Sequence, residues 1–278
     1  MKPAVTLRVN TLPKAVMQFR RVVWAYYKKH GRHNLPWRKT KDPYRILVSE
    51  VMLQQTQVER VLPFYKKFVK KFPTAERLTS ASLSSVLQMW QGLGYNRRAK
   101  MLRAAAKELA ATRTDPIAKL EALPGVGPYT ARAVAAFAYN ENVIFVETNI
   151  RTAVIQHFFP DRKEVGDSEI EETLQEALPP GKSREWYSAL MDYGASLKRS
   201  GISHNTRSRH YAKQSKFTGS LREARGAILR ALVLGAASPT HLINLFGDSR
   251  RVQMRAALRA LWKEQLIEKD NENYILAR

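Results

Sequence analysis

The spacing of apolar and polar positions predicts helices along most of the chain. Asp42-Pro43 is typical of a helix start, and the apolar positions after it recur at helical spacing as far as Gln54. Similar periods predict helices at residues 58–72, 83–90, 97–111, 117–123, 129–139, 148–159, 168–178 and 183–198, and an apolar stripe at residues 19–27 predicts one before them. Residues 143–146 resemble a strand but are too isolated to form a sheet, so the pattern predicts an all-α fold.

The pattern changes near Gly219. Helices are expected at residues 221–234, 239–246 and 249–263, and β-like residues 266–268 and 274–276 flank a turn-forming segment. Three helices followed by a hairpin is the order of a winged-helix (α+β) module. The last helix repeats a basic residue every fourth position, at Arg251, Arg255, Arg259 and Lys263. This ridge is either a solvated helix face or a DNA contact.

Charge narrows the classes of partner. The 278 residues include 47 Lys or Arg against 24 acids, which gives a formal net charge of +23. This excess indicates a polyanionic partner, and nucleic acid is the first candidate. A hydrophobic content of 44% excludes a disordered basic tail. The longest helical apolar stretch, residues 133–139, is too short to cross a membrane, and no signal-peptide core precedes it. We therefore expect no membrane partner and, if the organism is prokaryotic, a cytoplasmic protein associated with the nucleoid.

Residues 123–131, Leu-Pro-Gly-Val-Gly-Pro-Tyr-Thr-Ala, form the most specific local motif. An apolar helix end, a turn of two glycines around a valine and a helix starting at proline predict a helix–hairpin–helix. Backbone N–H groups exposed at such a helix start bind DNA phosphates without reading bases. The residues expected to contact DNA here are Gly125, Val126, Gly127, Tyr129 and Thr130. The alternative, a plain αα-corner, needs no such glycine pair.

Several motifs together resemble one enzyme family. They are Pro36-Trp37-Arg38, Pro43-Tyr44, Ser-Glu-Val-Met-Leu-Gln-Gln-Thr-Gln at residues 49–57, Trp-Gln-Gly-Leu-Gly-Tyr at residues 90–95 and Met-Asp-Tyr-Gly-Ala at residues 191–195. This set, spanning about residues 19–196, resembles the adenine-DNA glycosylases (MutY-like) of the helix–hairpin–helix (HhH-GPD) superfamily, which also contains endonuclease III. The resemblance implies a two-lobed helical fold, bent DNA and a target nucleotide flipped into a pocket.

Glu50 is the expected catalytic acid. It stands among apolar residues of a predicted helix, where partial burial raises the pKa of a carboxyl group. A carboxylic acid that is protonated near neutral pH can donate a proton to a purine ring nitrogen and so improve the leaving group. Spacing alone favours an exposed acid on the polar side of an amphipathic helix, and the surrounding motif reverses this preference in favour of the catalytic role.

The second carboxylate departs from the family pattern. Val146-Glu147-Thr148-Asn149 stands where the family has aspartate, a small residue and asparagine. The family's aspartate stabilises a positively charged sugar, and Glu147 carries the same charge on a longer arm, with Asn149 to position it. A helix N-terminal acid favoured by the dipole is the alternative. Tyr129 stands where strand-cleaving relatives have a lysine nucleophile, which implies an enzyme that leaves an abasic site.

The resemblance also assigns residues to the duplex and to the flipped base. Gln55 and Tyr95 match residues that wedge into DNA. The positions expected at the base pocket are Trp37, Arg38, Leu53, Gln54, Val58 and Ser188. Core packing explains Leu53 and Val58 equally well. The family has glutamate or glutamine at the position of Ser188, so adenine specificity is less secure than glycosylase activity.

No cofactor and no metal is expected. The chain has no cysteine, so the family's cysteine-ligated iron–sulfur cluster has no ligands, and basic residues take its place. These are Lys198, Arg199, Arg207, Arg209, Lys213 and Lys216, of which Arg207 and Arg209 are expected to contact DNA. The family's 8-oxoguanine-reading C-terminal domain is also expected to be absent, replaced by the winged-helix module.

These observations predict a monofunctional DNA glycosylase that removes adenine opposite guanine or 8-oxoguanine in double-stranded DNA, acting as a monomer. A mismatch uracil, thymine or modified-pyrimidine glycosylase and a non-catalytic DNA-binding protein are the alternatives. We expect a glycosylase domain at residues 1–217, with a barrel lobe at 35–147 and a second lobe from 1–34 plus 148–217. Residues 218–278 are expected to form the winged-helix domain.

Overall fold

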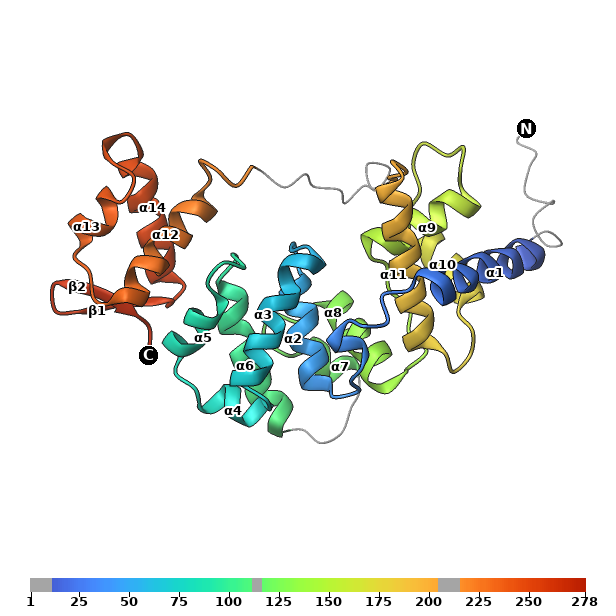
Figure 1. Ribbon diagram of the computed structural model, residues 1–278, viewed down its shortest axis with the longest axis horizontal. Helices are drawn as coiled ribbons and strands as arrows, with labels where there is room; N and C mark the ends of the chain where they lie inside the picture. Colours follow the sequence, from blue (N-terminus) through green and yellow to red (C-terminus); the bar gives the residue numbers. More distant parts are fainter. Residues whose placement is uncertain (1–11, 112–116, 205–215) are drawn as a thin grey trace. The chain divides into compact units, whose positions relative to one another are not determined.

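The computed structural model describes residues 12–111, 117–204 and 216–278 (Figure 1). Their contacts divide the chain into two compact units. The first unit comprises Met1–Pro43 and Pro128–Lys213, and the second comprises Tyr44–Gly127 and Gln214–Arg278. Each unit therefore combines segments that are far apart in the sequence.

The regular elements in the described part of the first unit are all helical. Its elements are α1 (Leu12–His30), the 3-10 turn η1 (Pro36–Arg38), α8 (Pro128–Val134), the π turn η2 (Ala135–Tyr139), α9 (Thr148–Phe158), α10 (Asp167–Ala177) and α11 (Ser183–Arg199). Its core holds fully buried aromatic rings: Phe19 of α1 meets Trp186 of α11 edge-on at 5.8 Å, and Phe145 stacks on Tyr187 at 3.9 Å. The apolar stripe of α1 is thus buried against α11.

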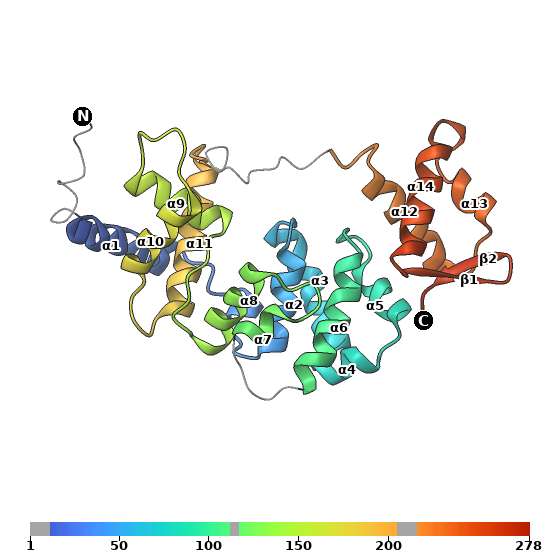
Figure 2. The same cartoon turned by 180° about the vertical axis from the view of Figure 1, so that it is seen from behind.

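Helices α9 and α11 pack side by side, as both views show (Figure 1, Figure 2). Gly194 makes this possible. A Cβ atom at Gly194 would lie 2.0 Å from the carbonyl oxygen of Asn149 and 2.5 Å from its carbonyl carbon. The glycine of the Met-Asp-Tyr-Gly-Ala motif is therefore required by backbone contact.

The second unit begins with a bundle of six helices. They are α2 (Pro43–Leu53), α3 (Val58–Lys71), α4 (Ala75–Ser80), α5 (Leu83–Trp90), α6 (Arg97–Ala111) and α7 (Ile117–Glu121). Phe68 and Trp90, both fully buried, meet edge-on at 5.8 Å in its core. The buried Tyr44 hydroxyl donates to the Phe72 carbonyl at 2.7 Å and ties the start of α2 to the end of α3.

Three helices and a hairpin follow in the same unit. They are α12 (Leu221–Leu234), α13 (Pro239–Asn244), the 3-10 turn η4 (Asp248–Arg250), α14 (Arg251–Lys263), β1 (Ile267–Asp270) and β2 (Asn273–Leu276). The strands pair antiparallel with Ile267 opposite Leu276, and Ala237 forms an isolated bridge with Tyr274. Lys100 of α6 donates to the Glu264 carbonyl at 2.9 Å and to the Gln265 side chain at 2.8 Å, which docks this module on the bundle.

The structure confirms the mostly helical fold and the small sheet near the C-terminus, with some corrections. Helix α4 was not expected, although its cap is readable: the Thr74 side chain accepts from the Arg77 N–H. The segment expected as one helix over residues 129–139 ends in the π turn η2. Residues 143–146 form neither helix nor strand. The hairpin turn is two residues long because Asn271 adopts φ +54°, which tight hairpins require.

A helix that crosses a membrane must be long and apolar, and the helices of the described ranges differ from this pattern. Not one of them is both long and apolar enough to cross a bilayer.

Candidate active site

Glu50 lies on α2 in the second unit with only 6% of its surface exposed. Its neighbours along the helix, from Ile46 to Met52, are buried as well. The helix is apolar on nearly all sides, so it is a core element and the carboxyl group is held inside it. The expected burial of Glu50 is confirmed.

Gln55 and Tyr95 share an unusual backbone conformation. Their φ angles are +56° and +48°, in the left-handed region that costs energy for residues other than glycine. Both follow the C-terminal ends of short helices, and the Gln55 side chain is exposed while Tyr95 is half-buried. Such backbone strain at two residues expected to enter DNA is consistent with a rigid presentation of their side chains.

Arg98 of α6 connects the two loops that carry these residues. Its guanidinium donates to the Val51 carbonyl at 2.7 Å on one side and to the Gly94 carbonyl at 3.1 Å on the other. It also lies over the Tyr95 ring, 5.4 Å from the centroid. Burial lowers the pKa of Arg98 to about 10, partly offset by Tyr95, so the guanidinium remains charged at neutral pH. The sequence analysis missed this residue, because a single arginine in a basic helix carries no signal of its contacts.

The hairpin motif adopts the expected tight turn. Gly125 has φ +75°, and a Cβ there would lie 2.6 Å from the Met101 Cβ, so only glycine fits. The Val126 N–H donates to the Leu123 carbonyl at 3.0 Å and its side chain is buried, whereas Gly125 and Gly127 are exposed. Helix α8 starts directly after the turn, with Thr130 buried in its first turn. The exposed glycines suit a phosphate contact.

In the first unit, Glu147 is the N-cap of α9. Its carboxylate accepts from the Asn149 N–H at 2.7 Å, from the Thr148 hydroxyl at 2.6 Å and from the Asn149 side-chain amide at 3.2 Å. The expected pairing of Asn149 with Glu147 is thus present. Because Glu147 caps the start of α9, the structure also shows the alternative role expected for this residue, that of an acid which stabilises a helix N-terminus.

Lys198 extends this cluster from α11. Its ammonium donates to the Thr148 hydroxyl at 2.9 Å, so a chain of hydrogen bonds runs from Lys198 through Thr148 to Glu147. Burial lowers the pKa of Lys198, while the charge of Glu147 raises it in part. We refer to these three residues as the Lys–Thr–Glu cluster. The sequence placed Lys198 in the region of the missing cysteines and gave no sign of this contact.

Arg38 and Ser188, both expected at the base pocket, are brought together in the first unit. Arg38 donates to the Ser188 carbonyl at 3.3 Å and to both oxygens of Asp192 at 2.6 and 2.9 Å. The backbone N–H and the side chain of Arg32 also donate to the carboxylate of the buried Asp192, at 2.7 and 2.6 Å. Trp37 beside Arg38 is buried in the turn η1. Asp192 is therefore the residue that fixes Arg38, a role the motif alone did not reveal.

The other expected residues are placed as follows. Leu53, Gln54 and Val58 are half-buried at the end of α2 and the start of α3. The ring of Tyr129 packs edge-on against Phe145 at 5.6 Å. Arg207 and Arg209 lie outside the described residues.

The basic ridge of α14 is exposed. Arg255 and Arg259 face outward, and Arg251 does so too, held to Asn244 at 2.9 Å and to Asp248 at 3.0 Å. The same face carries Val252 and Trp262, 82% and 55% exposed. Within the described ranges, His, Cys, Asp and Glu form no group of three or more that could hold a metal ion.

Comparison with known proteins places these residues in a family. Residues 48–180 match the family model described as HhH-GPD superfamily base excision DNA repair protein. The chain is 39% identical over 174 residues to the adenine DNA glycosylase of Mycolicibacterium smegmatis, covering 60% of this chain and 59% of that protein. It is 34% identical over 185 residues to the adenine DNA glycosylase of Buchnera aphidicola, covering 64% and 52%. The chain thus spans just over half the length of these relatives.

Solved structures have the same fold. A thermostable thymine-DNA glycosylase is similar with a TM-score of 0.58 and 25% identity, over 67% of this chain and 88% of that one. A trapped endonuclease III–DNA covalent intermediate is similar with a TM-score of 0.54 and 20% identity, over 74% and 90%. The family match covers Glu50, the hairpin and Glu147. Residues 48–180 therefore match the HhH-GPD superfamily base excision DNA repair model, and the chain is similar to the adenine DNA glycosylases.

Proposed function

We propose that the protein is a monofunctional base-excision DNA glycosylase that hydrolyses the N-glycosidic bond of adenine mispaired with guanine or 8-oxoguanine. The observation that carries the proposal is Glu50, a buried carboxyl group on an apolar helix inside the HhH-GPD domain. Mere DNA binding gives no reason to bury an acid, because moving a carboxylate out of water is costly. The similarity to proteins named adenine DNA glycosylase supports adenine as the base.

In this proposal Glu50 donates a proton to a ring nitrogen of the flipped base. Protonation withdraws electrons from the glycosidic bond and makes the base a neutral leaving group. The bond then breaks with positive charge developing on the sugar, and a fixed carboxylate stabilises such a charge. Glu147 is that carboxylate in our proposal, held in place by Thr148 and Asn149. Water completes the hydrolysis and leaves an abasic site.

Tyr129 supports the absence of strand cleavage. A phenol cannot form the Schiff base with the sugar on which β-elimination depends. Its ring packs against Phe145, so it serves the fold of the first unit as well. We therefore assign to the enzyme base release alone.

A second candidate keeps the reaction and changes the base. The similar structure of a thymine-DNA glycosylase favours thymine or another mispaired pyrimidine as substrate. Two residues point the same way, because Glu147 and Ser188 differ from the pattern of the adenine enzymes. The adenine assignment stands first, since the adenine glycosylases share 34% to 39% identity with this chain and the thymine enzyme shares 25%.

We propose double-stranded DNA as the partner of a monomeric enzyme. The net charge of +23 and the exposed ridge of Arg251, Arg255 and Arg259 favour a polyanion. The wedge residues Gln55 and Tyr95 and the hairpin glycines belong to the same DNA surface in this proposal. Residues 1–217 form the glycosylase domain and residues 218–278 a winged helix, whose third short strand is represented by the bridge of Ala237 with Tyr274.

The test is a panel of duplexes, each with one mispair, incubated with the protein and then treated with alkali to reveal abasic sites. We expect strand breaks at adenine opposite guanine or 8-oxoguanine. Glu50→Gln should abolish them and leave duplex binding nearly intact, because the amide keeps the shape and cannot donate the proton. Glu59→Gln is the matched control, since Glu59 is an exposed acid at the start of α3. Turnover by the Glu50 variant refutes the role of Glu50 as the acid, and release from pyrimidine mispairs alone refutes the adenine assignment.

A further inference from the structure

The loop that presents Tyr95 has three left-handed residues within four positions. Gly92, Gly94 and Tyr95 have φ angles of +100°, +72° and +48°. Glycine adopts many backbone conformations, so this loop needs contacts from outside to fix the direction of the Tyr95 side chain. The bundle fixes the backbone, because the ring N–H of Trp90 and the guanidinium of Arg98 both donate to the Gly94 carbonyl, at 3.2 and 3.1 Å.

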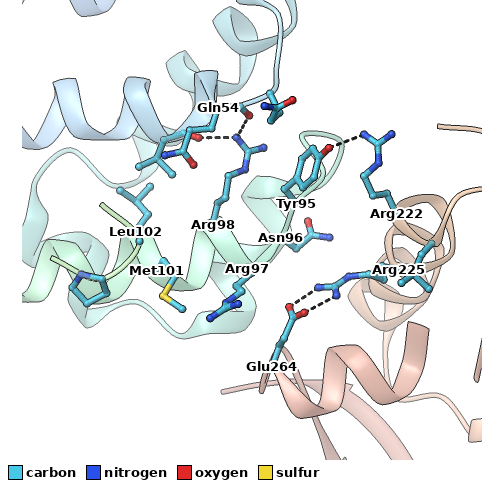
Figure 3. Close-up of a pocket in the computed structure, with 15 residues that line it drawn as sticks. Gln54, Tyr95, Asn96, Arg97, Arg98, Met101, Leu102, Arg222, Arg225 and Glu264 are labelled. Carbon is cyan, nitrogen blue, oxygen red and sulfur yellow. Dashed lines mark hydrogen bonds and ion pairs between the residues drawn. The ribbon is translucent and has the colours of Figure 1, made fainter. Parts of the chain in front are cut away.

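The Tyr95 side chain is held by two arginines from different elements. Arg98 of α6 lies over the ring, 5.4 Å from its centroid. Arg222 of α12 lies 5.2 Å from the same centroid and donates to the Tyr95 hydroxyl at 3.0 Å (Figure 3). Tyr95 and Arg222 also line a cavity of about 630 Å³. Close packing therefore does not surround the ring on all sides, and the two guanidinium groups supply much of its constraint.

The C-terminal module is docked beside this loop. Lys100 of α6 donates to the Glu264 carbonyl at 2.9 Å. Arg225, three residues after Arg222 on α12, binds the Glu264 carboxylate with two hydrogen bonds, one of them 2.7 Å long. Both contacts tie the module to the start of α6, which directly follows the Tyr95 loop. They therefore fix the place from which Arg222 reaches the tyrosine.

We propose that Arg222 is a positioning residue that holds the Tyr95 side chain in the direction in which it enters DNA. This inference rests on the proposed function, in which Tyr95 wedges into the duplex while the target base is flipped. Arg222 acts through Tyr95 and needs no contact with DNA. A side chain that is fixed in advance loses less conformational entropy when it enters the duplex, so this contact favours the flipped state. The C-terminal module then takes part in base flipping itself.

A direct contact of Arg222 with a DNA phosphate is the competing explanation, and it differs in two measurable ways. Loss of one phosphate contact lowers the slope of log affinity against log salt by about 0.9, whereas loss of a positioning residue leaves the slope unchanged. The effect of a positioning residue also disappears once Tyr95 is removed, whereas a phosphate contact keeps its effect.

The test is a double-mutant cycle of Arg222→Met and Tyr95→Ala in the full chain. Single-turnover base release is measured on a duplex with an adenine–guanine mispair, and a 2-aminopurine beside the mispair reports unstacking by its fluorescence. Arg222→Met removes the charge and keeps an apolar stem, so it should slow base release on the order of tenfold and reduce the fluorescence rise. In the Tyr95→Ala background the same change should have no further effect. Arg230→Met is the matched control, since Arg230 is exposed on the same helix.

Two results would overturn the inference. An effect of Arg222→Met that persists in the Tyr95→Ala background shows that Arg222 acts elsewhere, and a lower salt slope then identifies a DNA phosphate as its partner. A release rate no lower than that of Arg230→Met shows that Arg222 has no role. If Arg222→Met does not fold, Tyr95→Phe tests the contact from the other side, because it removes only the hydroxyl that accepts from Arg222. It should slow base release about threefold, and an unchanged rate contradicts the inference.

Fluorine NMR of the DNA-free protein separates this inference from the proposed function. In protein labelled with fluorotyrosine, the Tyr95 resonance is the one that is lost in Tyr95→Phe. Arg222→Met should broaden it, because the ring gains other orientations, and Arg230→Met should not. Broadening in a protein that releases no base refutes the proposed function and leaves the hold of Arg222 on Tyr95 standing. An unchanged resonance in an enzyme that releases base refutes this inference alone.

Discussion

Replacing Asp192 by asparagine tests how the first unit holds Arg38 in place. Asp192 is 2% exposed and accepts four hydrogen bonds, two from Arg38 and two from Arg32. Asparagine has nearly the same shape, but its NH₂ group cannot accept from a guanidinium and its charge is gone. Two arginines would be left facing a neutral group at the junction of α1, η1 and α11.

The expected loss of stability follows from this environment. Removing one partner of a buried ion pair costs about 3–5 kcal/mol, because the remaining charge stays buried without compensation. The Arg38 side chain is 11% exposed, whereas Arg32 is 28% exposed and can turn partly to water. Of the two cations, only Arg38 is therefore buried enough to depend on Asp192 for compensation of its charge. We therefore expect the lower end of the range, about 3 kcal/mol.

Hydrogen exchange of peptides from α11, measured across a urea series, reports on this unit alone. Asp161→Asn, at an exposed loop position, is the matched control and should change the free energy of opening by less than about 0.5 kcal/mol. A loss for Asp192→Asn no larger than that of the control would refute the argument. Trp37 fluorescence should also shift, since Arg38 is its neighbour in the turn η1.

The pH dependence supplies an independent check. Burial raises the pKa of the Asp192 carboxyl, but the hydrogen bonds and charges of Arg38 and Arg32 outweigh it and hold the pKa below its ordinary value of 3.8. A carboxyl group with a lowered folded-state pKa stabilises the protein fully above its unfolded pKa and loses this contribution as pH falls through the folded pKa. The difference in the free energy of unfolding between the wild type and Asp192→Asn should therefore be constant near neutral pH and should shrink below about pH 4.

Three other changes test the site. Lys198→Met or Thr148→Val should lower kcat for base release about tenfold, because each breaks the Lys–Thr–Glu cluster that holds the Glu147 carboxylate, and single-turnover rates measure this. Gly194→Ala should destabilise the first unit by several kcal/mol, roughly as overpacking does at its most severe, since the new methyl overlaps the Asn149 carbonyl, and urea unfolding measures this. Strand breaks should require alkali in the wild type, and a borohydride-trapped adduct would contradict the role given to Tyr129.

The local sequence pattern was sufficient to predict most of the helices and the resemblance to the family. Helical spacing located α3, α5 and α6 to within a residue or two, because each buries one continuous apolar face. The hairpin was predictable since two glycines around an apolar residue have few other uses, and the structure shows Gly125 at φ +75° with no room for a side chain. The burial of Glu50 followed from the apolar run around it.

Contacts between distant residues were not predictable in this way. Arg98 reaches carbonyls 47 positions away, and Arg38 reaches Asp192 across 154 positions. Nothing in the local composition around Arg98 distinguishes it from the many others of a chain with 47 basic residues, and the motif that singled out Arg38 did not reveal Asp192 as its partner. The cavity beside Arg222 depends likewise on two segments that meet only in the folded unit.

The Lys–Thr–Glu cluster links two departures from the family that the sequence presented separately. Glu147 has one more methylene group than aspartate, and the structure shows it folded back on the start of α9, where Asn149 and Thr148 donate to its two oxygens. A longer acid needs an additional constraint to hold its charge at one place, since each added rotatable bond brings further rotamers. Lys198 supplies one by bonding the Thr148 hydroxyl from α11. By the resemblance drawn from the sequence, Glu147 stands at the place of the family's aspartate and Lys198 in the region of its cluster cysteines. The structure joins these two positions through the Thr148 hydroxyl, so the lysine helps to hold the Glu147 carboxylate in one place.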